Sequence, residues 1–237
     1  MSQSIQTIPL LNLSFAFIPV LAALFILLKW SLNSSRSIHA ILRMLVQLLF
    51  IGYFLSYIFE SDSSLVVLAV LMVMILSSSW IALSSVSENR NALFKYAFIA
   101  IFLGGGLTLL IMSQGVLNLN PWYWPQYMIP LAGMIFANAM NSVSLACDRL
   151  VSELARGLSF QQARNTAMQT SLIPVTNSLF AVGLVSLPGM MTGQILSGVS
   201  PFIAARYQIM VMCMLFSASG ITAALFLVLI KSKLESS

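Results

Sequence analysis

Residues 64–84 read Ser64-Leu-Val-Val-Leu-Ala-Val-Leu-Met-Val-Met-Ile-Leu-Ser-Ser-Ser-Trp-Ile-Ala-Leu-Ser84, a stretch without a charged side chain. A helix of about 20 apolar residues is long enough to cross the hydrocarbon core of a bilayer. Because lipid offers the backbone no hydrogen bonds, such a stretch folds as a helix whose hydrogen bonds are internal. The stretch predicts a membrane-spanning helix, and its recurrence along the chain predicts an all-α polytopic helical bundle.

The composition of the whole chain agrees with lipid as its solvent. Of 237 residues, 59% are hydrophobic and 7% are charged, and the mean hydropathy is +0.95. A soluble domain carries about 25% charged residues. The net charge of +5 comes without a basic run, so we expect it to orient the chain rather than to bind nucleic acid. The single His39 and the separated Cys147 and Cys213 predict neither a histidine metal site nor a disulfide framework.

Apolar segments long enough to span recur seven times, at about 10–29, 39–59, 64–84, 94–113, 125–147, 173–196 and 204–230. The segments between them alternate between positive and neutral or acidic. The positive-inside rule then predicts an outside N-terminus and a cytoplasmic C-terminus, with Arg206 as the exception. The basic residues on the predicted cytoplasmic side are Lys29, Arg36, Arg90, Lys95, Arg149, Arg156, Arg164, Lys231 and Lys233.

The segment 173–196 differs from the other six. Pro174 opens it, and Pro188-Gly189 interrupts it near the middle. Proline removes a backbone donor and clashes with the preceding turn. Irregular backbone at membrane depth is tolerated only inside protein or beside a water-filled cavity. A full crossing and a re-entrant loop both remain open, and the charge pattern favours the crossing.

A polar, helix-forming stretch runs from Glu153 to Pro174. A lipid-embedded protein does not need such a stretch for stability, whereas a protein driven from the cytoplasm does. We interpret it as a docking helix for a soluble ATPase, within an insert at about 148–172; the alternative is an ordinary interfacial helix. The chain has no Walker A motif, so we expect no enzyme activity and no cofactor, with ATP bound by a separate subunit. The expected coupling residues are Glu153, Arg156, Gly157, Gln161 and Arg164.

Three groups of residues are candidates for a transport pathway. A helix broken at 188–192 would expose backbone groups to a substrate, or would serve as a hinge. Asn138 and Asn141 share a helical face with Met134 and are costly against lipid, so we expect them to face the bundle interior, lining a path or joining helices. Arg43 and Gln47 lie on a stripe that enters from the cytoplasm, where they would gate a path or snorkel.

Methionine is abundant, with fourteen residues. Thioethers favour soft ions such as Cu(I), whereas iron and aluminium prefer oxygen ligands. We interpret most methionines as adaptable core filler. The predicted spans contain no Asp or Glu, so they offer no carboxylate cage, and we assign no metal site. A metal cargo would travel as a complex.

Several strings resemble one known family. They are Ile129-Pro-Leu-Ala-Gly-Met134, Asn138-Ala-Met140, Val182-Gly-Leu-Val-Ser-Leu-Pro-Gly-Met-Met-Thr-Gly193 and Tyr207-Gln-Ile-Met210, with Arg43, Gln47 and Gly52. They are similar to the FetB-type (YbbM-like) permease family, related to plant aluminium-sensitivity membrane subunits. The resemblance implies the membrane subunit of an ATP-binding-cassette transporter, with iron export in bacterial members. The chain departs from the family pattern at Ala137 and at Arg156-Gly157-Leu158.

The resulting hypothesis is a single permease domain over 1–237, multi-pass in the inner (cytoplasmic) membrane, exporting iron or a related metal or metal complex. Its expected partners are the bilayer, an ATP-binding subunit and a second copy of itself. One alternative is an ATP-independent secondary transporter or channel, and another is a membrane scaffold or assembly factor. The expected pathway or gating residues are Arg43, Gln47, Met134, Asn138, Met140, Asn141, Pro188, Gly189, Met190, Met191, Thr192 and Gln208.

Overall fold

The computed structural model describes residues 8–84, 86 and 90–234, and these residues form helices and connecting loops without a β-strand. The elements, in chain order, are α1 (Leu10–Ser14), α2 (Phe17–Lys29), α3 (Ser34–Phe59), α4 (Ser64–Ala82), α5 (Arg90–Ala100), η1 (Ile101–Gly105), α6 (Gly106–Leu110), η2 (Ile111–Val116), α7 (Pro125–Ala155), α8 (Phe160–Ala181), α9 (Gly189–Leu196) and α10 (Pro201–Leu234). The elements η1 and η2 are π-helical turns. The predicted all-α class is confirmed.

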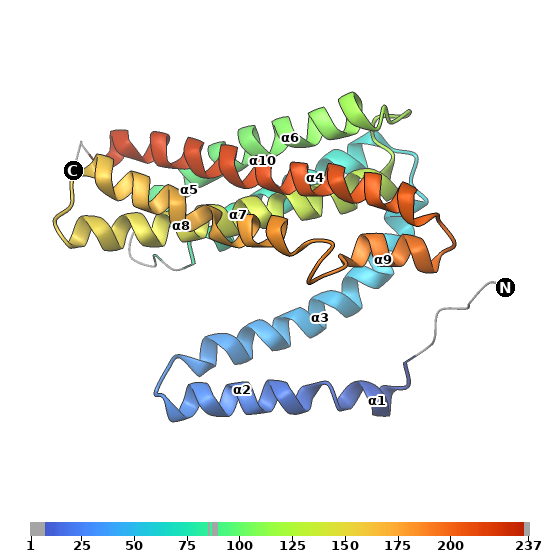
Figure 1. Cartoon of the computed structure of the whole chain (residues 1–237), viewed down its shortest axis with the longest axis horizontal. Coiled ribbons are helices and arrows are strands. Elements are labelled where there is room, and N and C mark those ends of the chain that lie inside the picture. Colours follow the sequence, from blue (N-terminus) through green and yellow to red (C-terminus); the bar gives the residue numbers. More distant parts are fainter. Residues whose placement is uncertain (1–7, 85, 87–89, 235–237) are drawn as a thin grey trace. The chain divides into compact units, whose positions relative to one another are not determined.

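Six helical stretches among the described residues are long and apolar enough to span a membrane. They are Leu10–Lys29, Ser34–Phe59, Ser64–Ala82, Arg90–Val116, Pro125–Ala155 and Pro201–Lys231. The remaining predicted segment, 173–196, is not among them, because α8 passes through Pro174, ends at Ala181 and is followed by a loop and α9. Together α8 and α9 still run back along α7, so that α10 ends near the start of α8 (Figure 1).

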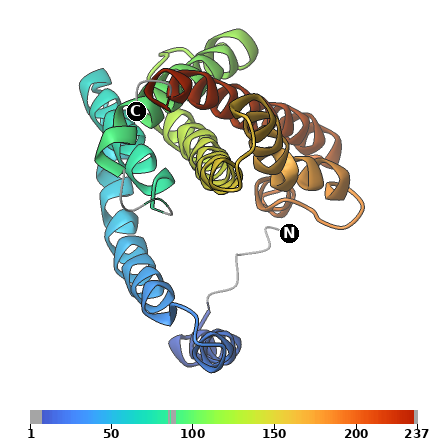
Figure 2. The same cartoon turned by 90° about the vertical axis from the view of Figure 1, so that its left-hand side faces the viewer.

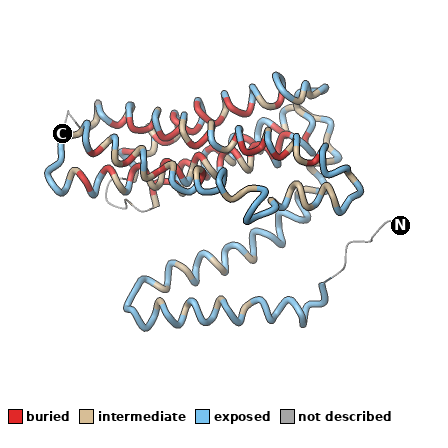
Figure 3. The backbone as a smooth tube through the Cα atoms, viewed as in Figure 1, coloured by how far each residue is buried: buried red, intermediate tan, exposed pale blue. Residues whose placement is uncertain are grey.

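The described residues fall into two compact units. The first, Met1–Ser61, contains α1 to α3, and none of the described residues in these helices is buried (Figure 3). The second, Asp62–Ser237, contains α4 to α10 and the whole buried core. The single permease domain remains a prediction, and the two units are described separately.

In the second unit α7 is the central helix. It packs against α4, α8, α10 and η1. Figure 2 looks down the axis of α7 (yellow-green), with neighbouring helices around it. Its buried side includes Ala132, Ala139, Val143 and Ala146, each fully buried. Small residues at this spacing allow neighbouring helices to approach closely in a membrane, where packing rather than hydrophobic burial drives association.

Two glycines show where helices approach most closely. A Cβ added at Gly104 would lie 2.6 Å from Thr222 Oγ1 and 3.0 Å from Thr222 Cα on α10. A Cβ added at Gly105 would lie 2.9 Å from the Phe136 ring on α7. Gly104 and Gly105 therefore allow close helix packing, and the glycines at 104–106 do not form a phosphate loop. Gly106 has open space around it and plays no such part.

Basic residues of the second unit gather at one end of the bundle. There α5 begins at Arg90, α7 gives way to α8, and α10 ends (Figure 1). Arg164 and Lys231 line the same hollow at this end. The opposite end carries Trp122 and Trp124, and Arg206 lies toward it near the start of α10. We call these the basic end and the aromatic end; the sidedness of the termini remains a prediction.

Candidate functional site

The connection between α8 and α9 is an irregular loop, 182–188. Gly183 adopts φ +82°, a conformation that favours glycine, and its N–H donates to the Ser186 carbonyl at 3.0 Å. Pro188 then precedes α9 with φ −62° and ψ 146°, an extended conformation that the proline ring allows. The predicted interruption of the helix is confirmed, and the non-helical backbone is residues 182–188. The expectation of a break across 188–192 is wrong, because Gly189 to Thr192 form the start of α9.

A cavity of about 320 Å³ lies against this interruption. Five of the predicted pathway residues line it: Met134, Pro188, Gly189, Met190 and Gln208. The structure thus brings together residues that lie on α7, α9 and α10. The remaining lining residues are Ser178, Val182, Ser186, Val211, Met212 and Leu215. Sequence reasoning missed the two serines, because an isolated serine in an apolar segment carries no distinguishing signal.

The polar atoms at this cavity differ in their bonding. The Ser178 hydroxyl donates to the Pro174 carbonyl at 3.0 Å. Thr192 does not line the cavity, and its hydroxyl donates at 3.2 Å to the carbonyl of Pro188, which does. Gln208 is only 5% exposed, and its Oε1 has no hydrogen-bond partner. A buried acceptor left unpaired costs about 1–3 kcal/mol. Gln208 Oε1 is therefore an atom that a bound donor or cation would satisfy.

A second cavity of about 290 Å³ adjoins the first on its aromatic-end side, and both are lined by Met134 and Met190. Met210 of α10 also lines it. The other lining residues are Leu117, Gln126, Tyr127, Pro130, Leu131 and Tyr207. No charged side chain among the described residues lines either cavity. We call the two together the methionine cavities.

Other predicted pathway residues lie outside the methionine cavities. Asn138 is half-buried, and its Nδ2 donates to the Met134 carbonyl at 2.9 Å, one turn earlier. The expectation that Asn141 faces the bundle interior is wrong, because its side of α7 is exposed. Met140 and Met191 are half-buried, and Met140 packs against the core. A helix of 31 residues has several faces, and the sequence did not show which one its neighbours cover.

Arg43 and Gln47 belong to the first unit, where both are exposed on α3. Their spacing of four residues places them on one face of that helix. Their role in gating remains a prediction.

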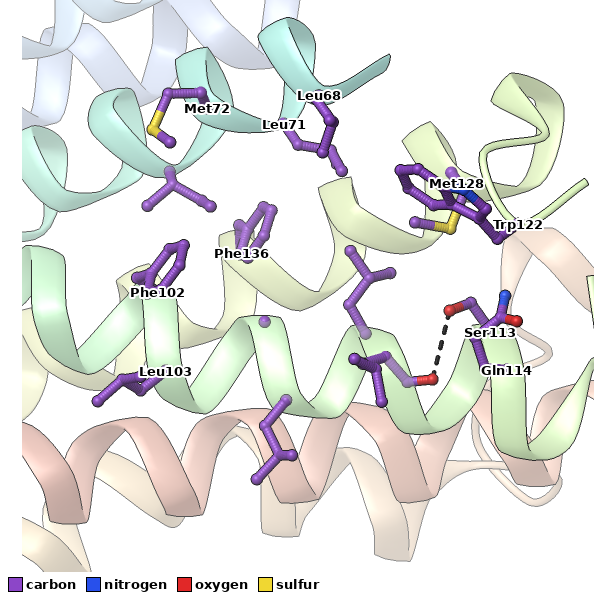
Figure 4. A pocket seen from close by; sticks show the side chains of 15 residues that line it. Leu68, Leu71, Met72, Phe102, Leu103, Ser113, Gln114, Trp122, Met128 and Phe136 are labelled. Carbon is purple, nitrogen blue, oxygen red and sulfur yellow. Dashed lines mark hydrogen bonds between the residues drawn. The ribbon is translucent and has the colours of Figure 1, made fainter. Parts of the chain in front are cut away.

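A groove of about 630 Å³ lies between α4, α6 and α7. Figure 4 shows Trp122 and Met128 together near one end of it, and Phe102 and Phe136 farther along. The polar side chains Gln114 and Ser113 line one part of this groove. The Ser113 hydroxyl donates to the Leu110 carbonyl at 3.3 Å. Such an apolar lining suits hydrocarbon chains rather than a polar cargo.

The turn from α7 to α8, at the basic end, is held by charge. Glu153 is buried, and its Oε1 lies 2.5 Å from an Arg149 nitrogen and 3.3 Å from an Arg156 nitrogen. Gly157 adopts φ +84° in the turn. Ser159 caps α8: its hydroxyl accepts from the Gln162 N–H, and the Gln162 side chain accepts from the Ser159 N–H. Paired charges and a capping box define this turn's geometry.

The expectation of a separate docking helix is therefore wrong in one respect. The polar stretch is the last residues of α7, a four-residue turn and the first half of α8, because α8 continues without a break from Phe160 to Ala181. Gln161 and Arg164, with Phe160 and Lys231, line a hollow of about 440 Å³ at the basic end. The predicted coupling residues thus lie on or beside one exposed turn.

Both α7 and α8 present polar residues outside the buried core. On α7 these residues recur every three or four positions: Asn141, Ser144, Asp148 and Ser152. On α8 the exposed residues include Gln162, Asn165, Gln169 and Asn177. Polar side chains at membrane depth normally face protein or water rather than lipid. We call these residues the polar face.

Residues 10–234 match the model of the Uncharacterised protein family UPF0014. The chain belongs to this family. It is 34% identical over 227 residues to the probable iron export permease protein FetB of Escherichia coli, covering 89% of this chain and 86% of that protein. It is also 34% identical to the UPF0014 membrane protein slr1647 of Synechocystis, covering 87% of this chain and 88% of the other. Identity to ALUMINUM SENSITIVE 3 of Arabidopsis thaliana is 31%, with 86% and 80% covered.

The suspected FetB-type resemblance is thus confirmed at the level of the UPF0014 family. No solved structure matches the chain. With its six apolar helical stretches, this UPF0014 member is a multi-pass membrane protein.

Proposed function

We propose that this UPF0014 chain is the membrane-spanning permease subunit of an ATP-driven transporter, and that a separate ATP-binding-cassette subunit hydrolyses the ATP. The observation that carries the proposal is the position of α8. This single helix begins at the charged turn and ends at the loop that lines the methionine cavities. A displacement applied at one end is transmitted to the other.

The dimensions of α8 suit such a connection. It has 22 residues, which corresponds to a length of roughly 33 Å at about 1.5 Å per residue. Pro174 lies within the helix, where the missing donor makes bending easier. Beyond Ala181 the loop 182–188 provides a hinge before α9. Force at Phe160 would therefore shift the backbone that borders Gln208 and Met190.

The turn itself has properties that a docking surface requires. Glu153 and its two arginines hold its start, and the Ser159 cap holds the start of α8. Gln161 and Arg164 remain available to a partner beside the hollow at the basic end. A rigid, polar turn at the end predicted to be cytoplasmic suits contact with a soluble ATPase.

We further propose that two copies of the chain pair through the polar face. Amide side chains such as those of Asn141 and Asn177 are costly against lipid. Small and polar residues are also those that membrane helices use to associate. Pairing two such faces would remove the polar side chains from lipid and enclose a polar route between the copies.

The cargo follows from relatives, and we propose it as iron or a related metal or metal complex leaving the cell. One relative is named as a probable iron export permease. The clustering of basic residues at one end of the second unit supports the predicted orientation, with the turn on the cytoplasmic side of the cytoplasmic membrane.

Two other functions compete with this one. An ATP-independent transporter or channel would need no docking turn, and a scaffold or assembly factor would need no cavity at a broken helix. A charged, polar turn and a cavity lie at opposite ends of α8, and this arrangement supports the ATP-driven permease.

Reconstitution tests the proposal. The purified chain is combined in proteoliposomes with a candidate ATP-binding-cassette subunit, and ATP hydrolysis is measured with and without the chain. We expect stimulation that R164E abolishes and R206E leaves intact, because Arg206 lies toward the opposite end of the second unit. Uphill transport by the chain without any ATPase would contradict the proposal.

A further inference from the structure

Four methionines surround the methionine cavities. Met134 and Met190 line both cavities, Met210 lines one, and Met212 lines the other. These residues come from α7, α9 and α10, so the fold brings them together from positions up to 78 apart in numbering (212 − 134). Each cavity has three thioethers in its lining.

Met134, Met190 and Met210 pack against the core, and Met212 is buried, so these side chains fill part of the interior. They also border two hollows of about 320 and 290 Å³. Thioether side chains at the wall of a hollow can supply sulfur lone pairs to a ligand there.

The other polar atoms of the larger cavity add lone pairs as well. Gln208 Oε1 is buried and unpaired, and the Ser178 hydroxyl already donates its proton to the Pro174 carbonyl. The remaining oxygen lone pairs of Ser178 and the sulfurs of Met190 and Met212 are electron-pair donors. A lining that offers electron pairs in this way suits a cation.

The charge of the site limits which cation it holds. Neither cavity is lined by a charged side chain among the described residues. Burying a divalent or trivalent ion without an opposing carboxylate is costly, and hard ions such as Fe(III) and Al(III) require oxygen ligands. A monovalent ion carries the smallest desolvation penalty, and thioethers select soft metals.

We propose that Met134 and Met190, together with Met210 or Met212, form a thioether site for a soft monovalent cation of the Cu(I) or Ag(I) class. As a binding site this does not rest on the proposed transport function; as a cargo site it does, and the cargo would then be a soft monovalent metal ion rather than iron. Gln208 Oε1 is a further ligand on the side of the larger cavity. The shared position of Met134 and Met190 would let an ion pass from one cavity to the other.

Silver binding tests the proposal directly. The full-length chain, with Cys147 and Cys213 replaced by alanine and serine so that thiols do not compete, is placed in lipid nanodiscs in chloride-free buffer and titrated calorimetrically with Ag(I). We expect saturable binding. M190L and M134L should each weaken it at least about tenfold, which corresponds to about 1.4 kcal/mol. Leucine nearly preserves the side-chain volume, so these variants should fold.

The matched control is M72L, because Met72 also lines a hollow, the apolar groove, but lies outside the methionine cavities. It should bind Ag(I) as the parent does. Absence of saturable binding, or equal weakening by M72L and M190L, would overturn the proposal. Failure of the transport function has a different signature: Ag(I) binds as expected, but the ATP-binding subunit is not stimulated by the chain.

Discussion

The close approach of α10 to the π-helical turn η1 leads to a quantitative prediction about two glycines. In G104A the new methyl group would lie 2.6 Å from Thr222 Oγ1, 3.0 Å from Thr222 Cα and 3.1 Å from Thr222 N. Two of these three atoms belong to the backbone, so a side-chain rotation does not relieve the contact. Overpacking of this kind typically costs about 1–3 kcal/mol.

Gly106 provides the matched control, since a methyl group there meets nothing within 4 Å. Both positions are helical, so each alanine gains a similar propensity of about 1 kcal/mol over glycine. That gain cancels when the two variants are compared, and the difference between them is the overpacking cost. About 1–3 kcal/mol corresponds to a melting temperature roughly 2–12 °C lower for G104A than for G106A.

The assay is thermal unfolding of the purified chain in one detergent, followed by size-exclusion recovery after heating. Adding T222A to G104A should restore part of the difference, because it removes the nearest contact atom but leaves the backbone contacts. Equal melting temperatures for G104A and G106A would refute the reasoning, since the described distance between η1 and α10 leaves no room for a methyl group.

Three further predictions concern the turn, the polar face and the cavity. E153Q removes the charge that two arginines share, and hydrogen bonds to charged groups contribute about 1.5–3 kcal/mol, so its free energy of unfolding and its melting temperature should fall. The exposed D148N should keep a free energy of unfolding within about 0.5 kcal/mol of wild type. N141C, in a background without native cysteines, should crosslink two copies of the chain in membranes. The control L76C, at an exposed position of α4, should not. Equal crosslinking by the two variants would argue against pairing through the polar face. Q208L removes an unpaired buried acceptor, so the melting temperature should stay the same or rise, while the transport rate should fall. An unchanged transport rate would show that Gln208 is not a pathway residue.

The candidate site was partly predictable because a broken helix leaves a local signal. Pro188-Gly189 marks the interruption in the sequence, and the structure places the cavity against it. The orientation of Asn141 was not predictable in the same way. Its helical face follows from its position in the chain, but whether that face is covered depends on where α4, α8 and α10 pack.

The docking stretch shows the same division. Its polarity and its place between two apolar segments are visible in the sequence. The sequence did not show that α8 continues through Pro174, because proline within a helix is tolerated where neighbouring helices and side chains satisfy the freed groups. In this case the carbonyl that loses its helical partner is that of Thr170, four residues before Pro174.

The sequence by itself determined that this protein lies in a membrane as a helical bundle, since hydropathy and helix length depend only on neighbouring residues and on the thickness of the bilayer. It also determined the UPF0014 family. Only the tertiary structure decided that Met134, Met190 and Gln208 meet at one place and that Gly104 admits α10. Those contacts join helices far apart in the chain, and they depend on packing geometry that no local pattern encodes.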